Sequence, residues 1–339
     1  MLITRFSAVG DIAMTLPVLY PLAEKYPNHR FVFVSRPRFK QFFINCPKNL
    51  EFREADPNNY KGLRGLYRLY KELKAEYAPD AFADLHNVLR TKILRMFFTL
   101  FNKTTTAHIE KGRAEKRRLV KNGSIDGKQL KSTFERYRDV FSSLGLQVES
   151  DFVSLFGEKK GNIDDLASYL PPKGNDRWVG IAPFAKHKGK IYPVELMRCV
   201  IERLSQERDI KIICFGNGKA EEEIVEKWCR DFNNVISFVG KSNFNGELRL
   251  ISNLNLMISM DSANMHLASL VNTRVLSIWG ATSPLAGFLG WRQKMEDCIE
   301  LPLKCRPCSV FGNKPCRTND YRCLNIPPER IVKKILEAV

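Results

Sequence analysis

Short runs of apolar residues alternate along this chain with longer stretches in which apolar residues recur every three or four positions. Parallel strands are covered on both faces and surface helices on one, so the short runs predict buried strands and the longer stretches predict amphipathic helices. The predicted strands are residues 2–6, 30–35, 50–53, 80–85 and 104–109 in the first half, and 178–182, 210–215, 235–238, 254–259 and 275–279 in the second. The main predicted helices are residues 12–26, 63–77, 88–101, 132–144, 193–205, 220–231, 247–252 and 328–338, with another that opens at residue 260.

This alternation of strand and helix occurs once in each half and is typical of parallel sheets covered by helices. The predicted fold class is therefore α/β, with two Rossmann-like, doubly wound domains that face each other across a ligand-binding cleft. A chain of 339 residues is long enough to bury two such cores. We expect a first domain over residues 1–160, a linker over 161–176, a second domain over 177–326 with a cysteine-rich tail, and a terminal helix over 327–339.

The stretch from Met260 to Ser269 passes directly from a predicted strand into a predicted helix. The first backbone N–H groups of a helix have no partner within the helix and carry partial positive charge, so they suit a phosphate. Ser262 and Ala263 are small enough to let a phosphate approach, and Asp261 lies at the strand end where ligands bind in open α/β sheets. The alternative is that Asp261 or Ser262 only caps the helix.

Two further strand-to-helix turns carry groups that suit a nucleotide. Lys186, Lys188 and Lys190 follow the predicted strand 178–182 and can hold a pyrophosphate, although lysines in loops are otherwise solvated. The Gly-rich turn 215–219 is followed by acidic residues that can either bind a ribose or stabilise the start of their own helix.

Asp11 follows the first predicted strand, where it can act as a general base for a substrate hydroxyl or simply cap the next helix. Its turn lacks the G-x-G-x-x-G spacing of a dinucleotide site and the G-K-[ST] of a P-loop. A Rossmann oxidoreductase and a P-loop enzyme are therefore disfavoured.

The net charge of +17 is concentrated in residues 1–150, where 27 Lys and Arg face 15 Asp and Glu. Such a surface suits an anionic partner (nucleic acid, acidic lipid, or a phosphorylated or carboxylated substrate), but it can also serve solubility alone. The most basic run is 111–121. No apolar run is long enough to span a bilayer, and Arg5 and Asp11 interrupt the apolar N-terminus. We therefore expect a cytoplasmic protein, either free or attached peripherally to the cytoplasmic face of the membrane.

Four of the nine cysteines, Cys305, Cys308, Cys316 and Cys323, form the pattern C-x2-C-x7-C-x6-C. They can hold a structural zinc or be reduced buried thiols, and the sequence assigns no metal firmly. Two other classes stay open. One is a basic nucleic-acid-binding protein with a zinc-knuckle-like tail, although no basic-aromatic stripe of the RNA-binding type is present. The other is a peripheral membrane scaffold that uses an apolar group whose helical spacing favours a core position instead: Leu94, Met96, Phe97, Phe98, Leu100 and Phe101.

Four motifs in order resemble glycosyltransferase family 9, the ADP-heptose:lipopolysaccharide heptosyltransferases. The opening segment 5–17, RFSAVGDIAMTLP, resembles the family's R-x-S-x-x-G-D-x-x-x-T-L-P start, and 190–193, KIYP, resembles its K-x-[WY]-P. Residues 261–268, DSANMHLA, with His266 in sixth place, resemble its D-[ST]-x-x-x-H-L-A. Residues 279–284, WGATSP, resemble its G-x-T-x-P.

This resemblance implies a two-domain GT-B fold and an inverting, metal-independent transferase without a cofactor. The N-terminal domain would bind an anionic lipopolysaccharide core and the C-terminal domain an ADP-sugar, with no role for nucleic acid. By the resemblance, Asp11 takes the proton of the acceptor hydroxyl and Lys190 contacts the donor diphosphate. Asp261 faces the sugar, and the backbone N–H groups of Ser262, Ala263 and Asn264 hold phosphate.

The sequence departs from the family pattern in two places. Ala185 and Lys186 stand where many members carry hydroxyl residues, so Lys186 is expected to act there as a point charge. Gly218 stands about where some members carry a ribose-binding glutamate, which moves that role to Glu221 or Glu222. A GT-B transferase with a different nucleotide-sugar donor therefore stays an alternative.

Overall fold

The computed structural model describes residues 1–123, 127–149 and 151–339. Contacts divide the chain into two compact units, one of residues 1–111 with 131–153 and the other of residues 112–130 with 154–339. These units place residues 112–130 and 154–160 with the second half of the chain. The domain limits expected from the sequence, 1–160, 161–176, 177–326 and 327–339, stay a prediction about folding units.

The first unit is built on a five-stranded sheet in the order β3-β2-β1-β4-β5, and every neighbouring pair is parallel. The central strand β1 pairs Ile3 with Phe33 on one side and with Ala83 on the other. Both faces of this strand are covered, which explains why its residues are all apolar or buried. The strands are β1 (Leu2–Thr4), β2 (Phe31–Ser35), β3 (Leu50–Glu54), β4 (Ala81–Asp84) and β5 (Thr105–His108).

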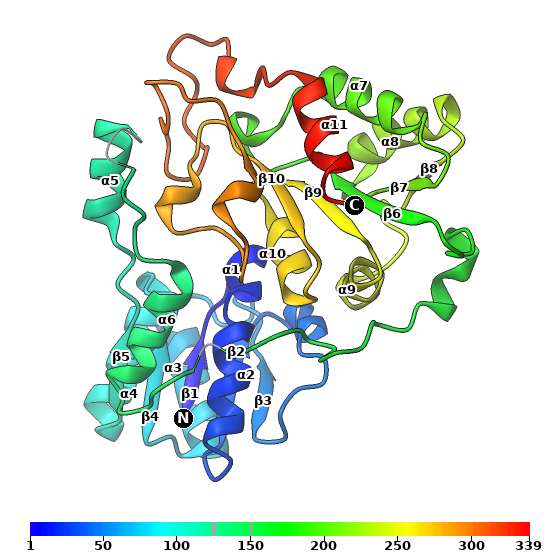
Figure 1. The fold of residues 1–339 in the computed structure, drawn as a ribbon. Helices are drawn as coiled ribbons and strands as arrows, with labels where there is room; N and C mark the ends of the chain where they lie inside the picture. Colours follow the sequence, from blue (N-terminus) through cyan, green and yellow to red (C-terminus); the bar gives the residue numbers. More distant parts are fainter. Residues whose placement is uncertain (124–126, 150) are drawn as a thin grey trace. The chain divides into compact units, whose positions relative to one another are not determined.

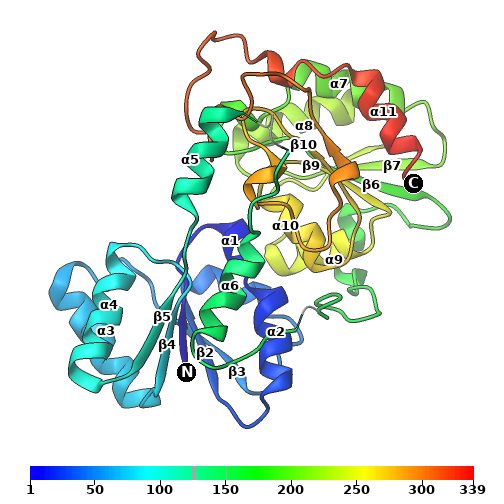
Figure 2. The same cartoon turned by 60° about the vertical axis from the view of Figure 1, so that its left-hand side comes forward.

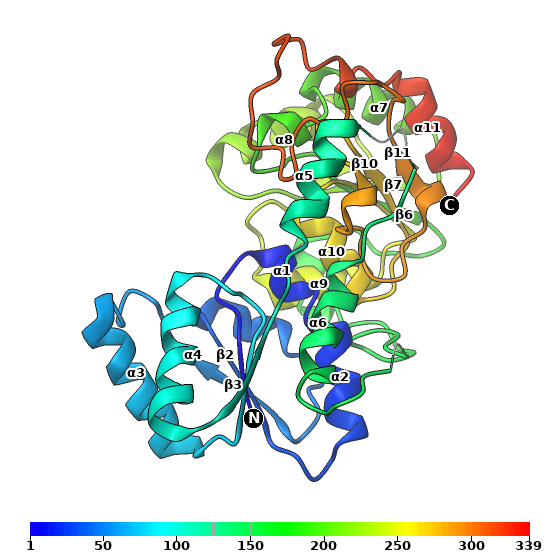
Figure 3. The same cartoon turned by 90° about the vertical axis from the view of Figure 1, so that its left-hand side faces the viewer.

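Helices cover both faces of this sheet, with α3 and α4 on one face and α2 and α6 on the other (Figures 2 and 3). The single helix predicted over residues 12–26 is in fact two, because Pro17 has no N–H to continue the hydrogen-bond ladder of the first helix. The helices are α1 (Val9–Ala13), α2 (Leu16–Lys25), α3 (Gly62–Tyr77), α4 (Leu89–Asn102) and α6 (Thr133–Ser142), with a 3₁₀ helix at Pro37–Phe42.

The second unit contains a six-stranded parallel sheet in the order β11-β10-β9-β6-β7-β8. Helices α7, α8 and α11 cover one face and α9 and α10 the other (Figure 1). The strands are β6 (Arg177–Ala182), β7 (Ile210–Cys214), β8 (Val235–Ser237), β9 (Leu256–Met260), β10 (Val275–Ile278) and β11 (Cys298–Ile299). The helices are α5 (Arg113–Asn122), α7 (Val194–Leu204), α8 (Lys219–Asp231), α9 (Phe244–Ser252), α10 (Ala263–Leu270) and α11 (Pro328–Leu336).

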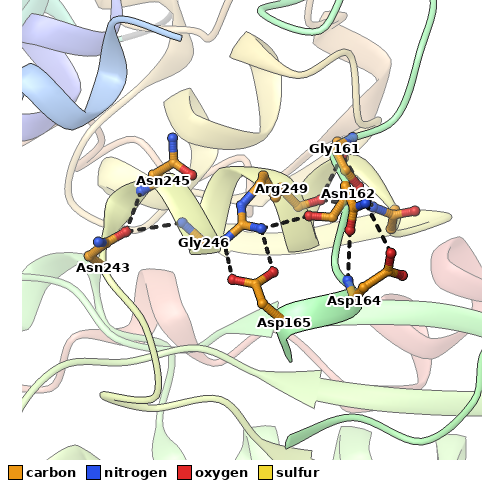
Figure 4. Close-up of polar contacts among 10 residues, drawn as sticks. Gly161, Asn162, Asp164, Asp165, Asn243, Asn245, Gly246 and Arg249 are labelled. Carbon is orange, nitrogen blue, oxygen red and sulfur yellow. Dashed lines mark hydrogen bonds and ion pairs between the residues drawn. The ribbon is translucent and has the colours of Figure 1, made fainter. Parts of the chain in front are cut away.

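The predicted linker is bound to α9 over its first residues (Figure 4). The Gly161 N–H donates to Ser252 Oγ at 2.8 Å, and Arg249 Nη1 donates to the Asn162 carbonyl at 2.8 Å. Arg249 also pairs with Asp165 through both carboxylate oxygens. This segment therefore packs as part of the second unit and includes a 3₁₀ helix at Asp164–Tyr169.

The most basic run of the sequence forms helix α5. Lys116 is buried, and its ammonium lies 4.0 Å from the centre of the Phe288 ring. The Leu130 N–H donates to the Leu285 carbonyl at 2.9 Å, which fixes the end of this segment to the same loop. Within the described part of the chain, no helix is long and apolar enough to cross a bilayer.

Candidate active site

Three of the singled-out motifs meet at the carboxyl end of strand β9. Asp261 follows this strand directly, is buried, and has its Oδ2 atom 2.8 Å from Lys190 Nζ. The Thr282 hydroxyl donates to the same oxygen at 2.8 Å. The structure therefore places a lysine, a carboxylate and a hydroxyl from three distant segments around one point. Thr282 has no role in the sequence interpretation, although it lies within the G-x-T-x-P motif.

The start of helix α10 lies beside this carboxylate. Ser262 is the N-cap residue in extended conformation, and its side chain makes no capping hydrogen bond to any described N–H group. Its hydroxyl lies instead 3.2 Å from that of Ser259. Asp261 is occupied by Lys190 and Thr282, so neither side chain serves the simple capping role. Ser262, Ala263 and Asn264 are half-buried, whereas His266 is buried one turn further along.

Lys190 is the one of the three loop lysines that the structure pairs with Asp261. Its stem lies against Gly312 of the cysteine-rich tail, where an added Cβ would be 2.7 Å from Lys190 Cγ. Lys188 instead lies with its ammonium 5.0 Å from the centre of the Tyr321 ring. Lys186 is exposed to solvent. Its expected role as a point charge toward the donor stays a prediction.

The cysteine-rich tail is hydrogen-bonded to the loop that carries Thr282. The N–H groups of Cys308 and Ser309 donate to the Ala281 carbonyl at 3.0 and 3.2 Å, and the Ala281 N–H donates to the Gly189 carbonyl at 2.8 Å. Arg306 is buried, donates to the Thr282 carbonyl at 2.9 Å, and pairs with Glu300 at 2.8 Å. The tail thus positions the two loops that present Lys190 and Thr282.

The tail cysteines differ in their surroundings. All nine cysteines lie in the described part of the chain as free thiols. Burial raises the pKa of Cys323 to about 11 and also raises that of Cys308, whereas a hydrogen bond with the Thr318 hydroxyl lowers the pKa of Cys316. Among the described residues, no three His, Cys, Asp or Glu side chains are grouped to hold a metal ion. The zinc alternative for Cys305, Cys308, Cys316 and Cys323 therefore has no support there.

The Gly-rich turn before α8 is shaped by a glutamate of its own helix. Glu221 folds back, so that its carboxylate accepts the Asn217 N–H at 2.7 Å. Gly218 is the N-cap with φ of +89°, a conformation that a glutamate at this position would adopt only under strain. Glu222 points elsewhere, 3.9 Å from Lys241 Nζ. Of the two glutamates considered for a ribose, Glu221 is thus engaged with its own loop.

In the first unit, Asp11 lies in the first turn of α1. Its Oδ2 atom accepts the Ala8 N–H at 3.0 Å. The alternative that Asp11 is the N-cap of a helix starting at Ile12 is wrong, because the helix begins at Val9, Ala8 is its N-cap and Asp11 is its third residue. The same oxygen lies 2.7 Å from Nη2 of Arg5, a buried residue whose side chain also donates to the Leu85 carbonyl. The Tyr137 hydroxyl donates to the Asp11 carbonyl at 3.1 Å. Arg5 belongs to the opening motif but has no role in the sequence interpretation.

His86 is a second neighbour that the sequence does not reveal. It follows β4, and its Nδ1 accepts the Phe6 N–H at 3.4 Å while its Nε2 lies 3.2 Å from Ser7 Oγ. Burial, followed by the positive charge of Arg5, lowers the pKa of His86 to about 3, so the imidazole is neutral. Asp84, fully buried at the end of β4, accepts the His86 N–H at 2.9 Å and fixes the turn.

Comparison with known proteins identifies the family. Residues 66–317, well over half of the chain, match the family described as glycosyltransferase family 9 (heptosyltransferase). The chain belongs to glycosyltransferase family 9.

Relatives and solved structures agree with this membership. The chain is 24% identical to lipooligosaccharide heptosyltransferase 2 of Campylobacter jejuni, over 96% of this chain and 94% of that protein. A family 9 glycosyltransferase of Veillonella parvula covers 99% of this chain and 96% of its own with a TM-score of 0.76 at 16% identity. The E. coli ADP-heptose lipopolysaccharide heptosyltransferase II covers 99% and 97% with a TM-score of 0.70 at 15% identity.

The predicted fold class, two parallel-sheet α/β domains of the GT-B type, is confirmed by these structures and by the two sheets described above. Family membership makes the protein a glycosyltransferase. The alternatives of a nucleic-acid-binding protein and a membrane scaffold receive no support from it.

The site in the second unit has the composition of an anion-binding site. Lys190 supplies a positive charge and the first turn of α10 supplies backbone N–H groups without helical partners. The site in the first unit contains a partly exposed carboxylate that can act as a general base. Asp11 keeps 31% of its side chain exposed, and the guanidinium of Arg5 compensates its charge.

Proposed function

We propose that this family 9 glycosyltransferase transfers a heptose from ADP-heptose to a hydroxyl of the lipopolysaccharide inner core, with inversion at the anomeric carbon. The observation that carries the proposal is the group of Lys190, Asp261 and Thr282 at the start of α10. The names of relatives support the sugar and acceptor, because the Campylobacter jejuni protein is a lipooligosaccharide heptosyltransferase and the E. coli protein uses ADP-heptose.

On the donor side, the departing ADP gains negative charge on its terminal phosphate as the bond to the sugar breaks. A cation and backbone N–H groups held in place before the reaction stabilise that charge without reorganisation. Lys190 and the N–H groups of Ala263 and Asn264 are the groups that would do so. Lys190 would exchange part of its contact with Asp261 for the diphosphate, which leaves Asp261 and Thr282 to contact the sugar.

On the acceptor side, Asp11 would accept the proton of the attacking hydroxyl. The hydroxyl oxygen then forms the new bond to the anomeric carbon from the face opposite the leaving ADP, which inverts the configuration. Arg5 would act as a positioning residue, because it fixes the carboxylate by an ion pair at 2.7 Å from a buried position. The excess of basic residues in positions 1–150 suits an acceptor that carries phosphates or acidic sugars.

The same proposal covers where the enzyme works. The lipopolysaccharide core grows on a lipid anchor, so we place the enzyme in the cytoplasm with peripheral attachment to the inner membrane. A different nucleotide-sugar donor is the second candidate. Ala185 and Gly218 favour it because they replace family positions that contact phosphate and ribose.

Calorimetric titration with ADP, UDP, GDP, CDP and AMP tests the donor assignment. We expect selective binding of ADP, weakened at least about tenfold in Lys190→Ala because a charge-assisted contact to phosphate is lost. The matched control is Lys333→Ala, which removes an exposed lysine on α11 and should leave binding unchanged.

Each outcome has a distinct meaning. Preference for another diphosphate would keep the transferase and replace the donor. Equal affinity of the wild type and Lys190→Ala for ADP would move the phosphate site elsewhere. Absence of binding to all five nucleotides would contradict the donor site altogether.

A further inference from the structure

Helices α3 and α4 expose an unusual number of large apolar side chains. Eleven such side chains are exposed among the described residues, and six of them lie on these two helices. The six, called here the α3–α4 face, are Leu63, Tyr67, Leu89, Met96, Leu100 and Phe101. Leu89, Leu100 and Leu63 are the most exposed, at 75%, 65% and 63%.

The two helices that carry these side chains pack side by side on one face of the sheet (Figures 2 and 3). The Tyr67 ring of α3 contacts the Phe101 ring of α4 at 6.1 Å and the Phe97 ring at 5.6 Å between centroids. Positions 63 and 67, and positions 89, 96 and 100, share one side of their helices by spacing. The apolar side chains therefore share the outer sides of two neighbouring helices, and Tyr67 links the two helices through its ring contacts.

The core does not need the α3–α4 face. The opposite sides of the two helices already supply the buried contacts to the sheet. The expectation that the apolar group at 94–101 lies in the core is right for Leu94, Phe97 and Phe98. It is wrong for Met96, Leu100 and Phe101, because the helix has more apolar residues than one buried side can hold. Contiguous exposed apolar surface of this kind marks an interaction site.

Positive charge surrounds the α3–α4 face. Helix α4 has no acidic residue, and its ends and polar side carry exposed Lys92 and Lys103. On α3, Arg64, Lys71 and Lys74 are exposed along the side that carries Tyr67, and the Lys71 ammonium lies 5.9 Å from the Tyr67 ring centre. No salt bridge joins any of these five cations to a carboxylate of residues 1–123, 127–149 or 151–339.

We propose that the α3–α4 face docks this enzyme on the surface of an anionic phospholipid bilayer. The apolar side chains would enter the boundary between headgroups and acyl chains, and the five cations would pair with lipid phosphates. Charge complementarity favours this partner. The α3–α4 face has apolar side chains surrounded by cations, and an anionic bilayer has apolar acyl chains beneath a layer of negative headgroups. The proposal rests on the proposed function in one respect only: docking would bring the enzyme to a lipid-anchored acceptor.

Vesicle flotation tests the docking surface with the full chain. We expect binding to vesicles of phosphatidylcholine with phosphatidylglycerol and little binding to phosphatidylcholine alone. The double variant Leu100→Ser/Phe101→Ser should bind the acidic vesicles at least about tenfold more weakly, since two exposed apolar anchors are lost. Arg64→Glu/Lys71→Glu should weaken binding by a similar factor and remove much of its salt dependence.

The matched control is Met295→Ser/Phe311→Ser, which removes two exposed apolar side chains of the second unit. It should bind vesicles like the wild type. All the altered positions are exposed, so circular dichroism should show an unchanged fold and urea unfolding a folded protein at the temperature of the assay. Equal vesicle binding by the wild type and both α3–α4 variants, or no binding by the wild type, would overturn the proposal. So would a wild-type dimer that the serine variant dissociates without any change in vesicle binding.

Transfer to a deacylated, water-soluble core acceptor separates this proposal from the proposed function. Leu100→Ser/Phe101→Ser should retain wild-type transfer to that acceptor, because neither side chain belongs to the proposed donor or acceptor site. Vesicle binding that the variants lose, combined with no transfer by the wild type to any core acceptor, would contradict the function and leave the docking surface standing.

Discussion

At the residue scale, Asp11 stabilises the start of its own helix and is also the proposed base. Its carboxylate holds the first turn of α1 through the Ala8 N–H and is itself held by Arg5. These contacts fix the orientation of the carboxylate, as a general base that acts on a substrate hydroxyl requires. Structural capping and base catalysis are therefore compatible uses of one side chain.

Asp11→Asn should lower kcat by about 10²–10⁴-fold, because an amide accepts no proton while it can still accept the Ala8 N–H. The dissociation constant for ADP should stay within about twofold, since the donor contacts are assigned to other residues. Steady-state kinetics and calorimetry measure the two quantities. Asp139→Asn, which removes a carboxylate paired with Lys131, is the control. A kcat near the wild-type value in Asp11→Asn would remove Asp11 from the reaction.

His86 makes a prediction about pH. In the unfolded chain its pKa is about 6.5, and in the fold burial and Arg5 lower it to about 3. Above pH 6.5 both states are neutral and the stability is fully present. As the pH falls from about 6.5 toward 3, the unfolded chain binds a proton that the folded chain does not, so the free energy of unfolding falls.

Urea unfolding near pH 7.5 and pH 4.5 should therefore show a smaller loss of stability in His86→Asn than in the wild type. His108→Asn, at an exposed histidine, should behave like the wild type. If His86→Asn and the wild type lose equal stability on acidification, His86 is not the group responsible.

Strand order explains which site residues the sequence could and could not reveal. Asp261 lies at the end of a predicted strand, and Asp11 and Lys190 lie in the turns that follow predicted strands, so the pattern finds them. Arg5 and His86 approach each other only because β1 lies beside β4, some 80 positions further along the chain. Hydrophobic periodicity predicts that both strands are buried but does not say which strands are neighbours.

At the scale of elements, the sequence predicts most long periodic segments well, although 12–26 divides into two helices, and it predicts short or packed segments poorly. The helix expected over 63–77 is α3, within one residue. Strand β11 has two residues, too few for any apolar pattern, and is recognisable only by its pairing with Ser277 and Ile278 of β10. The composition of residues 161–176 predicts a loop. Its first residues instead bind Arg249 and Ser252 of α9, and these tertiary contacts cannot be predicted from composition.

Gly65 in the first turn of α3 tests an element-scale contact. A Cβ at this position would lie 2.5 Å from the carbonyl carbon of Tyr60, which is backbone and cannot move aside. Gly65→Ala should therefore lower the free energy of unfolding by about 1–3 kcal/mol, although alanine favours a helix by about 1 kcal/mol. Urea unfolding measures the change.

The control for Gly65 is Ala75→Gly on the exposed side of the same helix. It should cost about 1 kcal/mol through helix propensity alone. A gain of stability in Gly65→Ala would mean that the approach of Tyr60 is not a constraint on this helix.

At the scale of the whole molecule, the net charge of +17 should govern the approach of an anionic acceptor. Raising the ionic strength from about 20 mM to about 500 mM should lower kcat/KM for the core acceptor about tenfold or more, with kcat nearly constant. A dephosphorylated core serves as the control and should respond less. Equal salt dependence for both acceptors would mean that the basic excess does not serve acceptor binding.

The sequence predicted two parallel α/β sheets correctly because each buried strand is a nearly continuous apolar run. It could not predict that residues 112–123 and 127–130 pack with the second half of the chain. That assignment depends on single contacts, such as those of Lys116 with Phe288 and of Leu130 with Leu285. Such contacts produce no hydrophobic periodicity in the sequence.

Gly312 of the cysteine-rich tail leaves room for the aliphatic stem of Lys190, so the tail affects where the Lys190 ammonium lies. Any larger residue there would displace the stem of Lys190. The position of the Lys190 side chain thus depends on a segment more than a hundred positions further along the chain. If Lys190 binds the donor diphosphate as proposed, changes in that segment would alter donor binding while every residue of the donor motifs stays the same. Selection on substrate choice in this enzyme would then act on its least regular part.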